Sequence, residues 1–405
     1  MLNKQVYLDY TATTPVSPEV LEAMLPYFSE IYGNPSSVYS FSQKSRDAIE
    51  KARSQVAKAL NADANEIYFT SSGTEADNWA LKGVLERMRK AGKGDHLITT
   101  KIEHHAILHT ANYLEKINNF KVTYLPVDEY GRVRLEDLKN AVTDKTVLVS
   151  IMFANNEVGT IEPVKEIGAF CRENKILFHT DAVQAAAHLD IDVKDLNIDL
   201  LSMSAHKMYG PKGIGALYIK SPLKFENFMH GGAQERGRRA STENIAGIVG
   251  FGAAMEILKS RLSEDRPRIA KLRDKLIKGI LNKIPHAKLN GALGDERLPN
   301  NVNFSFIGVE GETLLLDLDM KGICASTGSA CSSESLDPSH VLLALGLSHE
   351  MAHGSLRFTL GRYSTEDDID YLLSVLPDIV ARRRAMSPLW EDYLKQGADP
   401  GPISK

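Results

Sequence analysis

Short apolar runs alternate with longer amphipathic stretches from about Pro18 to Leu258. This alternation of strand-like and helix-like segments predicts a mostly parallel sheet covered by helices. The expected strands are residues 66–70, 96–99, 121–125, 147–152, 176–179, 200–203 and 216–219. Because ligands of open α/β sheets bind outside the carboxyl ends of the strands, we expect functional side chains to follow these segments.

Polar side chains do gather after five of the expected strands. The polar clusters are residues 71–75, 103–105, 155–159, 181–184 and 204–207. Since parallel strands end at the same edge of a sheet, the pattern predicts one site built from several distant segments.

The pattern changes after a long charged helix, expected from about Ala253 to Lys283. Strands at 301–306 and 356–359 then alternate with helices, which predicts a smaller α+β domain. The short strand expected within residues 1–9 can join it. We therefore expect a large α/β domain over 15–258 and a small domain formed by 1–14 and 259–405, with a partly ordered tail after Met386.

Composition narrows the class of protein. The 405 residues carry a formal net charge of −4 and are 43% hydrophobic, which is ordinary for a soluble enzyme and shows no basic footprint for nucleic acid. No segment reaches the roughly 20 apolar residues of a membrane span, and the first residues do not resemble a signal peptide. Three cysteines, Cys171, Cys324 and Cys331, are too few for a disulfide framework, so we expect a cytoplasmic protein.

Lys207 and Asp181 indicate the chemistry of the site. Lys207 ends the run Ser204-Ala205-His206-Lys207 after one strand, and Asp181 ends another strand, with Gln184 one helical turn later. A lysine amine and an acidic partner suit pyridoxal phosphate, which is held as a lysine Schiff base with a carboxylate on its ring nitrogen. The plainer alternatives are a solvated surface lysine and an aspartate that only caps a helix.

The segment Thr70 to Glu75 joins a strand to a helix. Gly73 and Thr74 can present backbone N–H groups at the helix start, where the helix dipole favours a phosphate. An ordinary N-cap would show the same residues. Ser204 and His206 in the lysine run strengthen the phosphate interpretation.

A second reactive group is expected at Cys331. Its surroundings, residues 326–333, are small and polar, unlike the apolar setting of a structural cysteine. Downstream, Arg357 can clamp a substrate carboxylate with its planar guanidinium. An incidental loop cysteine is the alternative, whereas Cys324, beside apolar Ile323, is expected to be a packing residue.

Taken together, these motifs resemble the cysteine desulfurases of the NifS/IscS type, in the class V aminotransferase family of fold-type I pyridoxal phosphate enzymes. The resemblance extends over nearly the whole chain and includes residues 7–10, 13–15, 33–36, 230–232 and 387–390. It implies a large domain with a mostly parallel mixed sheet and a smaller α+β domain that carries the cysteine loop, about residues 322–335.

The resemblance also implies roles for individual residues. His104 would stack on the cofactor ring and move protons, although a structural histidine is the common alternative. Asn156 would contact cofactor or substrate, although it could be a turn residue. Thr242 would reach the cofactor phosphate of a neighbouring subunit, which implies a homodimer.

The implied activity is conversion of L-cysteine to L-alanine, with the sulfur left on Cys331 as a persulfide. The Lys207 amine would remove the substrate α-proton, Asp181 would hold the ring, and Arg357 and Asn156 would bind the substrate. The sulfur would pass to an iron–sulfur scaffold protein or another acceptor. No metal, nucleic acid or membrane is expected to take part.

The sequence is also compatible with other functions. An aminotransferase or a selenocysteine lyase would share the cofactor fold, and an aminotransferase would not need Cys331. The literal motif 349–353, His-Glu-Met-Ala-His, could mark a zinc peptidase, but Gly354 leaves the helix too short. A noncatalytic sulfur-transfer adaptor would bind no cofactor. The glycine-rich segment 210–215 precedes a strand, so we expect a turn that supports Lys207.

Overall fold

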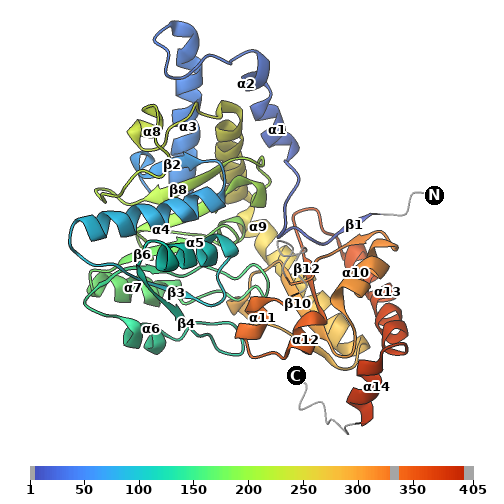
Figure 1. Ribbon diagram of the computed structural model, residues 1–405. Helices are drawn as coiled ribbons and strands as arrows, with labels where there is room; N and C mark the ends of the chain where they lie inside the picture. Colours follow the sequence, from blue (N-terminus) through green and yellow to red (C-terminus); the bar gives the residue numbers. More distant parts are fainter. Residues whose placement is uncertain (1–4, 329–336, 396–405) are drawn as a thin grey trace.

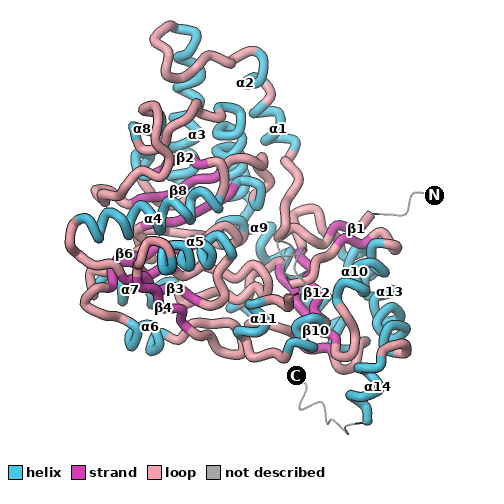
Figure 2. Tube along the Cα trace, in the orientation of Figure 1, coloured by secondary structure: helices cyan, strands magenta, loops and turns pink. Residues whose placement is uncertain are grey.

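The computed structural model describes residues 5–328 and 337–395. A seven-stranded sheet forms the centre of the larger part of the molecule, in the order β2-β8-β7-β6-β5-β3-β4 (Figures 1 and 2). Its strands are β2 (Ile67–Thr70), β3 (His96–Thr100), β4 (Lys121–Leu125), β5 (Thr146–Ser150), β6 (Leu177–Asp181), β7 (Leu200–Ser204) and β8 (Gly215–Ile219). All seven correspond to strands expected from the sequence.

Only β8 runs against the other strands of this sheet. It pairs antiparallel with both β2 and β7, whereas β3, β4, β5, β6 and β7 form parallel pairs. The predicted mostly parallel mixed sheet is therefore confirmed. The carboxyl ends of the parallel strands lie along one edge, where the polar clusters follow.

Helices cover both faces of this sheet because its strands are apolar on both sides. Leu148 packs against one face with α4 and α5, while the next residue, Val149, packs against the other with α3, α7 and α9. The covering helices are α3 (Gln43–Ala59), α4 (Gly73–Lys90), α5 (His105–Lys116), α6 (Leu135–Ala141) and α7 (Val164–Glu173). Short helices α1 (Pro18–Met24), α2 (Pro26–Ser29) and α8 (Gln234–Gly237) lie at the upper end in Figure 1.

A second apolar core lies in the C-terminal part. Strands β9 (Ala287–Leu289), β10 (Asn301–Phe306) and β12 (Ser355–Thr359) form an antiparallel sheet in the order β12-β10-β9. The N-terminal β1 (Val6–Tyr7) pairs parallel with β11 (Ile323–Cys324). Helices α10 (Gly311–Asp319) and α13 (Glu366–Arg384) cover this region.

One helix connects the two cores. In α9 (Ile245–Lys283), Phe251 and Leu258 belong to the core of the large sheet, and Leu272 and Ile280 belong to the second core. We keep the division near residue 258 as a proposal on this ground. Helices α11 (His340–Ala344) and α12 (His349–His353) follow the boundary in sequence but pack on the large core.

The expected tail contains a further helix, α14 (Pro388–Lys395). Trp390 anchors it, because the Arg384 guanidinium lies 4.3 Å from the centre of its ring. Within residues 5–328 and 337–395, no helix is both long and apolar enough to cross a bilayer.

Candidate active site

A cavity of about 420 Å³ opens at the carboxyl ends of the parallel strands. It brings together most of the residues selected from the sequence. Those that line it are Gly73, Thr74, His104, Asn156, Asp181, Gln184, Ser204, His206, Lys207 and Arg357. Thr242 is exposed and does not line the cavity, and Cys331 lies outside the described residues.

Lys207 lies in a 3-10 turn, Ala205–Lys207, directly after β7. Its Nζ donates hydrogen bonds to the carbonyl oxygens of Thr11, at 2.6 Å, and Ala12, at 2.7 Å. The N-terminal segment thus holds the amine at the cavity wall. Gln184 belongs to the same arrangement, because its Nε2 donates to the Thr11 carbonyl at 3.2 Å.

Asp181 is the last residue of β6 and is buried. One carboxylate oxygen accepts the backbone N–H of Val183 at 2.9 Å. Burial raises the pKa of Asp181 to about 6, against the lowering effects of this bond and of the Lys207 charge. The Asp181 carboxylate therefore does two things. It accepts a local backbone hydrogen bond, as a simple capping aspartate would, and it also lines the cavity.

A buried histidine supports this strand. The His179 ring is hydrogen bonded to Ser150 Oγ at 2.8 Å and to Ser202 Oγ at 3.0 Å, which ties β6 to the strand on each side. Burial lowers the pKa of His179 to about 3. The ring is thus neutral at physiological pH and fastens β6, the strand that ends at Asp181, to its two neighbours.

The start of α4 forms a compact cup. Ser72 caps the helix by accepting the Glu75 N–H at 3.1 Å. A methyl group on Gly73 would lie 2.7 Å from Val183 Cγ2, so only glycine fits between the helix and the next strand exit. An 18-residue helix presents free N–H groups and a partial positive charge at this end, which suits a phosphate.

An acidic side chain in this first turn does not oppose an anion. Glu75 accepts two hydrogen bonds from Arg239, at 2.9 and 3.0 Å, and one from the Ser71 N–H at 2.7 Å. Its charge is therefore compensated. His206 also lines the cavity; it is hydrogen bonded to Thr13 Oγ1 at 3.1 Å, and burial lowers its pKa to about 4.

His104 is the N-cap of α5. Its Nδ1 accepts the Ala106 N–H at 3.1 Å, so the proton of the neutral ring is on Nε2. Burial, followed by the positive charge of Lys207, lowers its pKa to about 4. At neutral pH this ring is an uncharged hydrogen-bond donor beside the cavity.

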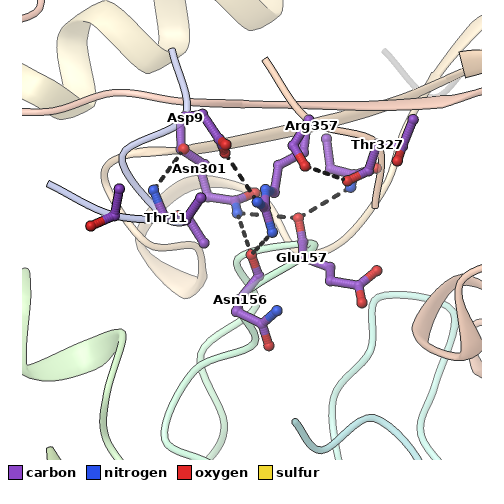
Figure 3. Close-up of polar contacts among 12 residues, drawn as sticks. Asp9, Thr11, Asn156, Glu157, Asn301, Thr327 and Arg357 are labelled. Atoms are coloured by element: carbon purple, nitrogen blue, oxygen red, sulfur yellow. Dashed lines mark hydrogen bonds and ion pairs between the residues drawn. The ribbon is translucent and has the colours of Figure 1, made fainter. Parts of the chain in front are cut away.

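Arg357 lies on β12 and is 2% exposed. Its Nη2 donates to Asp9 at 3.1 Å and its Nη1 donates to the Asn156 carbonyl at 3.1 Å, as Figure 3 shows. The Nε atom is buried without a partner within the described residues. Since guanidinium has five N–H donors, these two bonds leave capacity for a bound carboxylate.

Several further residues line the cavity that sequence reasoning did not select. They are Thr11, Ala12, Ser72, Asp77, Glu103, His105, Met152, Ala154, Glu157, Val183 and His340. Burial raises the pKa of Glu103 to about 8 and that of Glu157 to about 7. Both glutamates belong to polar clusters that follow expected strands, residues 103–105 and 155–159. Nothing in those clusters indicates that the glutamates are completely buried.

These residues fit pyridoxal phosphate. An amine and a carboxylate lie on the same cavity, the start of a long helix closes tightly at Gly73, and a buried guanidinium nitrogen and Thr11 Oγ1 lack partners within the described residues. This combination of groups is the one that the cofactor requires.

Neither the His-Glu-Met-Ala-His motif at 349–353 nor the glycine-rich segment 210–215 has the structure that its alternative function requires. The five-residue helix α12 carries both His349 and His353 on the surface. Across the described part of the chain, no cluster of three or more His, Cys, Asp or Glu residues could hold a metal. The segment 210–215 leads into β8, as expected for a turn.

Known proteins have similar sequences along nearly the whole chain. Residues 6–372 match the family described as Aminotransferase class-V. The chain is 67% identical to cysteine desulfurase IscS of Clostridium botulinum, over 97% of this chain and 99% of that protein. It is 58% identical to cysteine desulfurase IscS of Methanosarcina thermophila, over 96% and 95% respectively.

Solved structures agree. A NifS-like protein superposes with a TM-score of 0.87 at 42% identity, covering 93% of this chain and all (100%) of that one. A structure titled "SspA in complex with cysteine" gives a TM-score of 0.78 at 38% identity, covering 89% and 100%. The chain therefore belongs to the class-V aminotransferase family, in its cysteine desulfurase branch of the NifS/IscS type. It is an enzyme, and its cofactor is pyridoxal phosphate.

Proposed function

We propose that this enzyme converts L-cysteine to L-alanine through Lys207 and transfers the substrate sulfur to Cys331. The observation that carries the proposal is the convergence of Lys207, Asp181 and the start of α4 on one cavity, with Arg357 on another wall. Membership of the cysteine desulfurase branch gives the reaction class, and these side chains give it a location.

Pyridoxal phosphate, when bound, supplies an electron sink for the bond to the substrate α-carbon. In the proposal, Lys207 would hold the cofactor, and its amine would accept and return the substrate α-proton. Asp181 keeps a proton on the ring nitrogen. Gly73 and Thr74 would bind the phosphate through backbone N–H groups, together with Ser204 and His206, and Gln184 would bind the ring hydroxyl.

On the substrate side, Arg357 would bind the carboxylate of cysteine, with Asn156 beside it. The Asp9 carboxylate on Nη2 and the Asn156 carbonyl on Nη1 fix the guanidinium plane. His104 would lie against the ring as a neutral group, and its Nε2–H is the proton that it can share. Such contacts would fix the orientation of the substrate in the cavity.

Sulfur transfer in this scheme is a nucleophilic displacement. The Cys331 thiolate attacks the substrate sulfur, an S–S bond forms, and the C–S bond breaks. The electron pair of that bond stays with the substrate carbon, which is protonated and leaves as alanine. The balance needs no external oxidant, because the substrate carbon is reduced as the sulfur is oxidised to the persulfide level.

We also propose a homodimer. Large apolar side chains project from the N-terminal arm around α2, including Phe28 at 63% exposed, Tyr32 at 65% and Val38 at 98%. Such a concentration is a typical protein interaction surface, and a second copy of the chain would cover it. Exposed Thr242 would then reach the cofactor phosphate of the neighbouring subunit.

The sulfur acceptor that we propose is an iron–sulfur scaffold protein or another sulfur-accepting protein in the cytoplasm. A persulfide on a segment of small polar residues can be passed on to such a partner by thiol exchange. Whichever protein accepts the sulfur, the proposed substrate is L-cysteine.

The test is turnover of L-cysteine by the purified enzyme, with alanine and sulfide measured together. Lys207→Ala should abolish alanine formation and change the absorption spectrum of the cofactor. Cys331→Ala should stop turnover while leaving that spectrum intact. Full alanine production by Cys331→Ala, dependent on an added oxoacid, would instead identify an aminotransferase.

A further inference from the structure

The two ends of the segment that carries Cys331 meet at one buried side chain. After the segment, Ser339 Oγ donates a hydrogen bond to Glu157 Oε2 at 2.5 Å. Before it, a methyl group on Gly328 would lie 2.9 Å from the same Oε2 atom and 3.2 Å from Ser339 Cβ. Residues eleven positions apart in the chain therefore converge on the carboxyl group of Glu157.

Glu157 is held rigidly from its backbone. Its N–H donates to Asn155 Oδ1 at 2.8 Å, and its carbonyl accepts from the side chains of Asn301 and Asn303, both at 3.1 Å. These asparagines lie on β10, whose neighbour β12 carries Arg357. Glu157 itself is 2% exposed. The carboxyl group is thus a fixed point on the cavity wall.

Both flanks also contact proposed site residues or their neighbours. Ser326 exchanges backbone hydrogen bonds with Arg357, at 3.1 and 2.7 Å, in the region shown in Figure 3. On the other side, His340 Nε2 donates to the carbonyl of Glu103, the residue before His104, at 3.0 Å. The start and the end of the Cys331 segment are therefore each attached to the cavity wall.

Burying a carboxyl group lowers the free energy of unfolding unless hydrogen bonds or a charged partner offset the loss of hydration. Burial raises the pKa of Glu157, while the bond from Ser339 and the charge of Arg357 lower it. An apolar residue at this position would avoid that cost. The presence of a carboxyl group at this position is explained if it positions the two flanks.

We propose that Glu157 is a positioning residue for the sulfur acceptor, holding Gly328 and Ser339 together so that Cys331 can reach the substrate sulfur. The inference rests on the proposed function, since it takes Cys331 as the acceptor. It assigns Glu157 no contact with the reacting atoms. Its effect should therefore fall on the sulfur-transfer step and not on substrate binding.

The experiment follows one turnover with L-cysteine. Absorption of the bound cofactor reports substrate binding, and mass spectrometry of quenched samples reports sulfur on Cys331. Glu157→Leu should slow persulfide formation roughly 10- to 100-fold, the loss expected for a hydrogen bond to a charged group, with little change in the cysteine concentration for half-saturation. Glu157→Gln keeps an acceptor oxygen and should recover most of the rate.

Matched changes on the partner side separate positioning from helix capping. Ser339→Ala removes the bond to Glu157 and also the cap of α11, an N–H bond from Leu342 at 3.2 Å. Ser348→Ala removes only the equivalent cap of α12, from Met351 at 3.2 Å. Ser339→Ala should slow persulfide formation, and Ser348→Ala should not. Combining Ser339→Ala with Glu157→Leu should add little to either single change.

The outcomes separate the positioning role of Glu157 from the role of Cys331 as sulfur acceptor. Persulfide formation at the wild-type rate in Glu157→Leu, or equal losses in binding and transfer, would overturn the positioning role alone. Absence of sulfur on Cys331 in the wild-type enzyme would overturn the proposed function as well. Should Glu157→Leu not fold, Gly328→Ala supplies the test, because its added methyl group presses on the same carboxylate and should slow the same step.

Discussion

At the scale of single residues, the cavity depends on ionisable groups whose charge is set by burial. Asp181 and Glu157 face it with raised pKa values, and His104 and His206 face it with lowered ones. Burial disfavours the charged form in each case. Where a charge is retained, a specific partner must therefore stabilise it.

Asp181 should show this most clearly. Asp181→Asn removes the charge that would pair with the protonated ring nitrogen, and turnover of L-cysteine should fall roughly 10- to 100-fold. The absorption spectrum of the bound cofactor should shift as well. Asp199→Asn is the matched control, because Asp199 bonds to the Phe178 N–H at 3.1 Å but does not line the cavity. Equal losses in the two variants would argue against a cofactor role.

Glu162 predicts a pH dependence of stability. It is buried, one oxygen accepts the Val133 N–H, and burial raises its pKa from 4.5 to about 8. Between these values the folded state binds a proton that the unfolded state does not, so stability falls as pH rises, by up to about 1.4 kcal/mol per pH unit.

Glu162→Gln cannot ionise and should lose that contribution. Urea unfolding of both proteins across this pH range measures it. The free energy of unfolding of the variant should improve relative to wild type as pH rises toward 8. Parallel curves across the range would show that Glu162 does not titrate as stated.

At the scale of elements, the junction between β2 and α4 is the most constrained. Gly73→Ala would place a methyl group 2.7 Å from Val183 Cγ2 and 3.4 Å from Ser204 Cβ, so the helix start must move. We expect weaker binding of pyridoxal phosphate, measured by titrating the apoenzyme. Asn78→Ala, five residues further along α4, is the control and should bind normally. Unchanged affinity in Gly73→Ala would remove the phosphate from this helix start.

The elements were also the most predictable part of the molecule. Most of the strands β2 to β8 follow from short apolar runs, because a strand buried on both faces leaves a continuous apolar signal. The edge strand β4 is only partly buried and has a weaker signal. Lys207 and Asp181 could be selected because they directly follow such strands. The carbonyl of Thr11 could not, since 196 residues separate it from Lys207. The burial of Glu157 is likewise a product of β10 and β12 packing, which has no local signature.

At the scale of the whole molecule, α9 links two cores and the cavity lies beside residues from both parts. Asp9 and Arg357 come from the smaller part, whereas Asp181 ends β6 of the large sheet and Lys207 lies in the turn after β7. Because Lys207 is held by the carbonyl oxygens of Thr11 and Ala12, movement between the parts would change both the substrate side and the lysine side of the cavity.

The proposed dimer gives a prediction at this scale. Val38→Asp together with Phe28→Asp places charges in the exposed apolar arm and should convert a dimer to a monomer in sedimentation experiments. Cofactor affinity should fall with it, because Thr242 of the neighbour would be lost. A control with the exposed Leu316→Asp, on α10, should remain dimeric. A wild-type monomer with full activity would contradict both claims.

The most direct measurement concerns which cysteine receives sulfur. The wild-type enzyme is mixed with L-cysteine, quenched within one turnover, alkylated and digested, and the peptides with Cys171, Cys324 and Cys331 are weighed. Buried Cys171, whose pKa burial raises to about 12, and half-buried Cys324 are internal controls. We expect one added sulfur atom on the Cys331 peptide and an equal amount of alanine. Sulfur on another cysteine, or alanine without any persulfide, would contradict it.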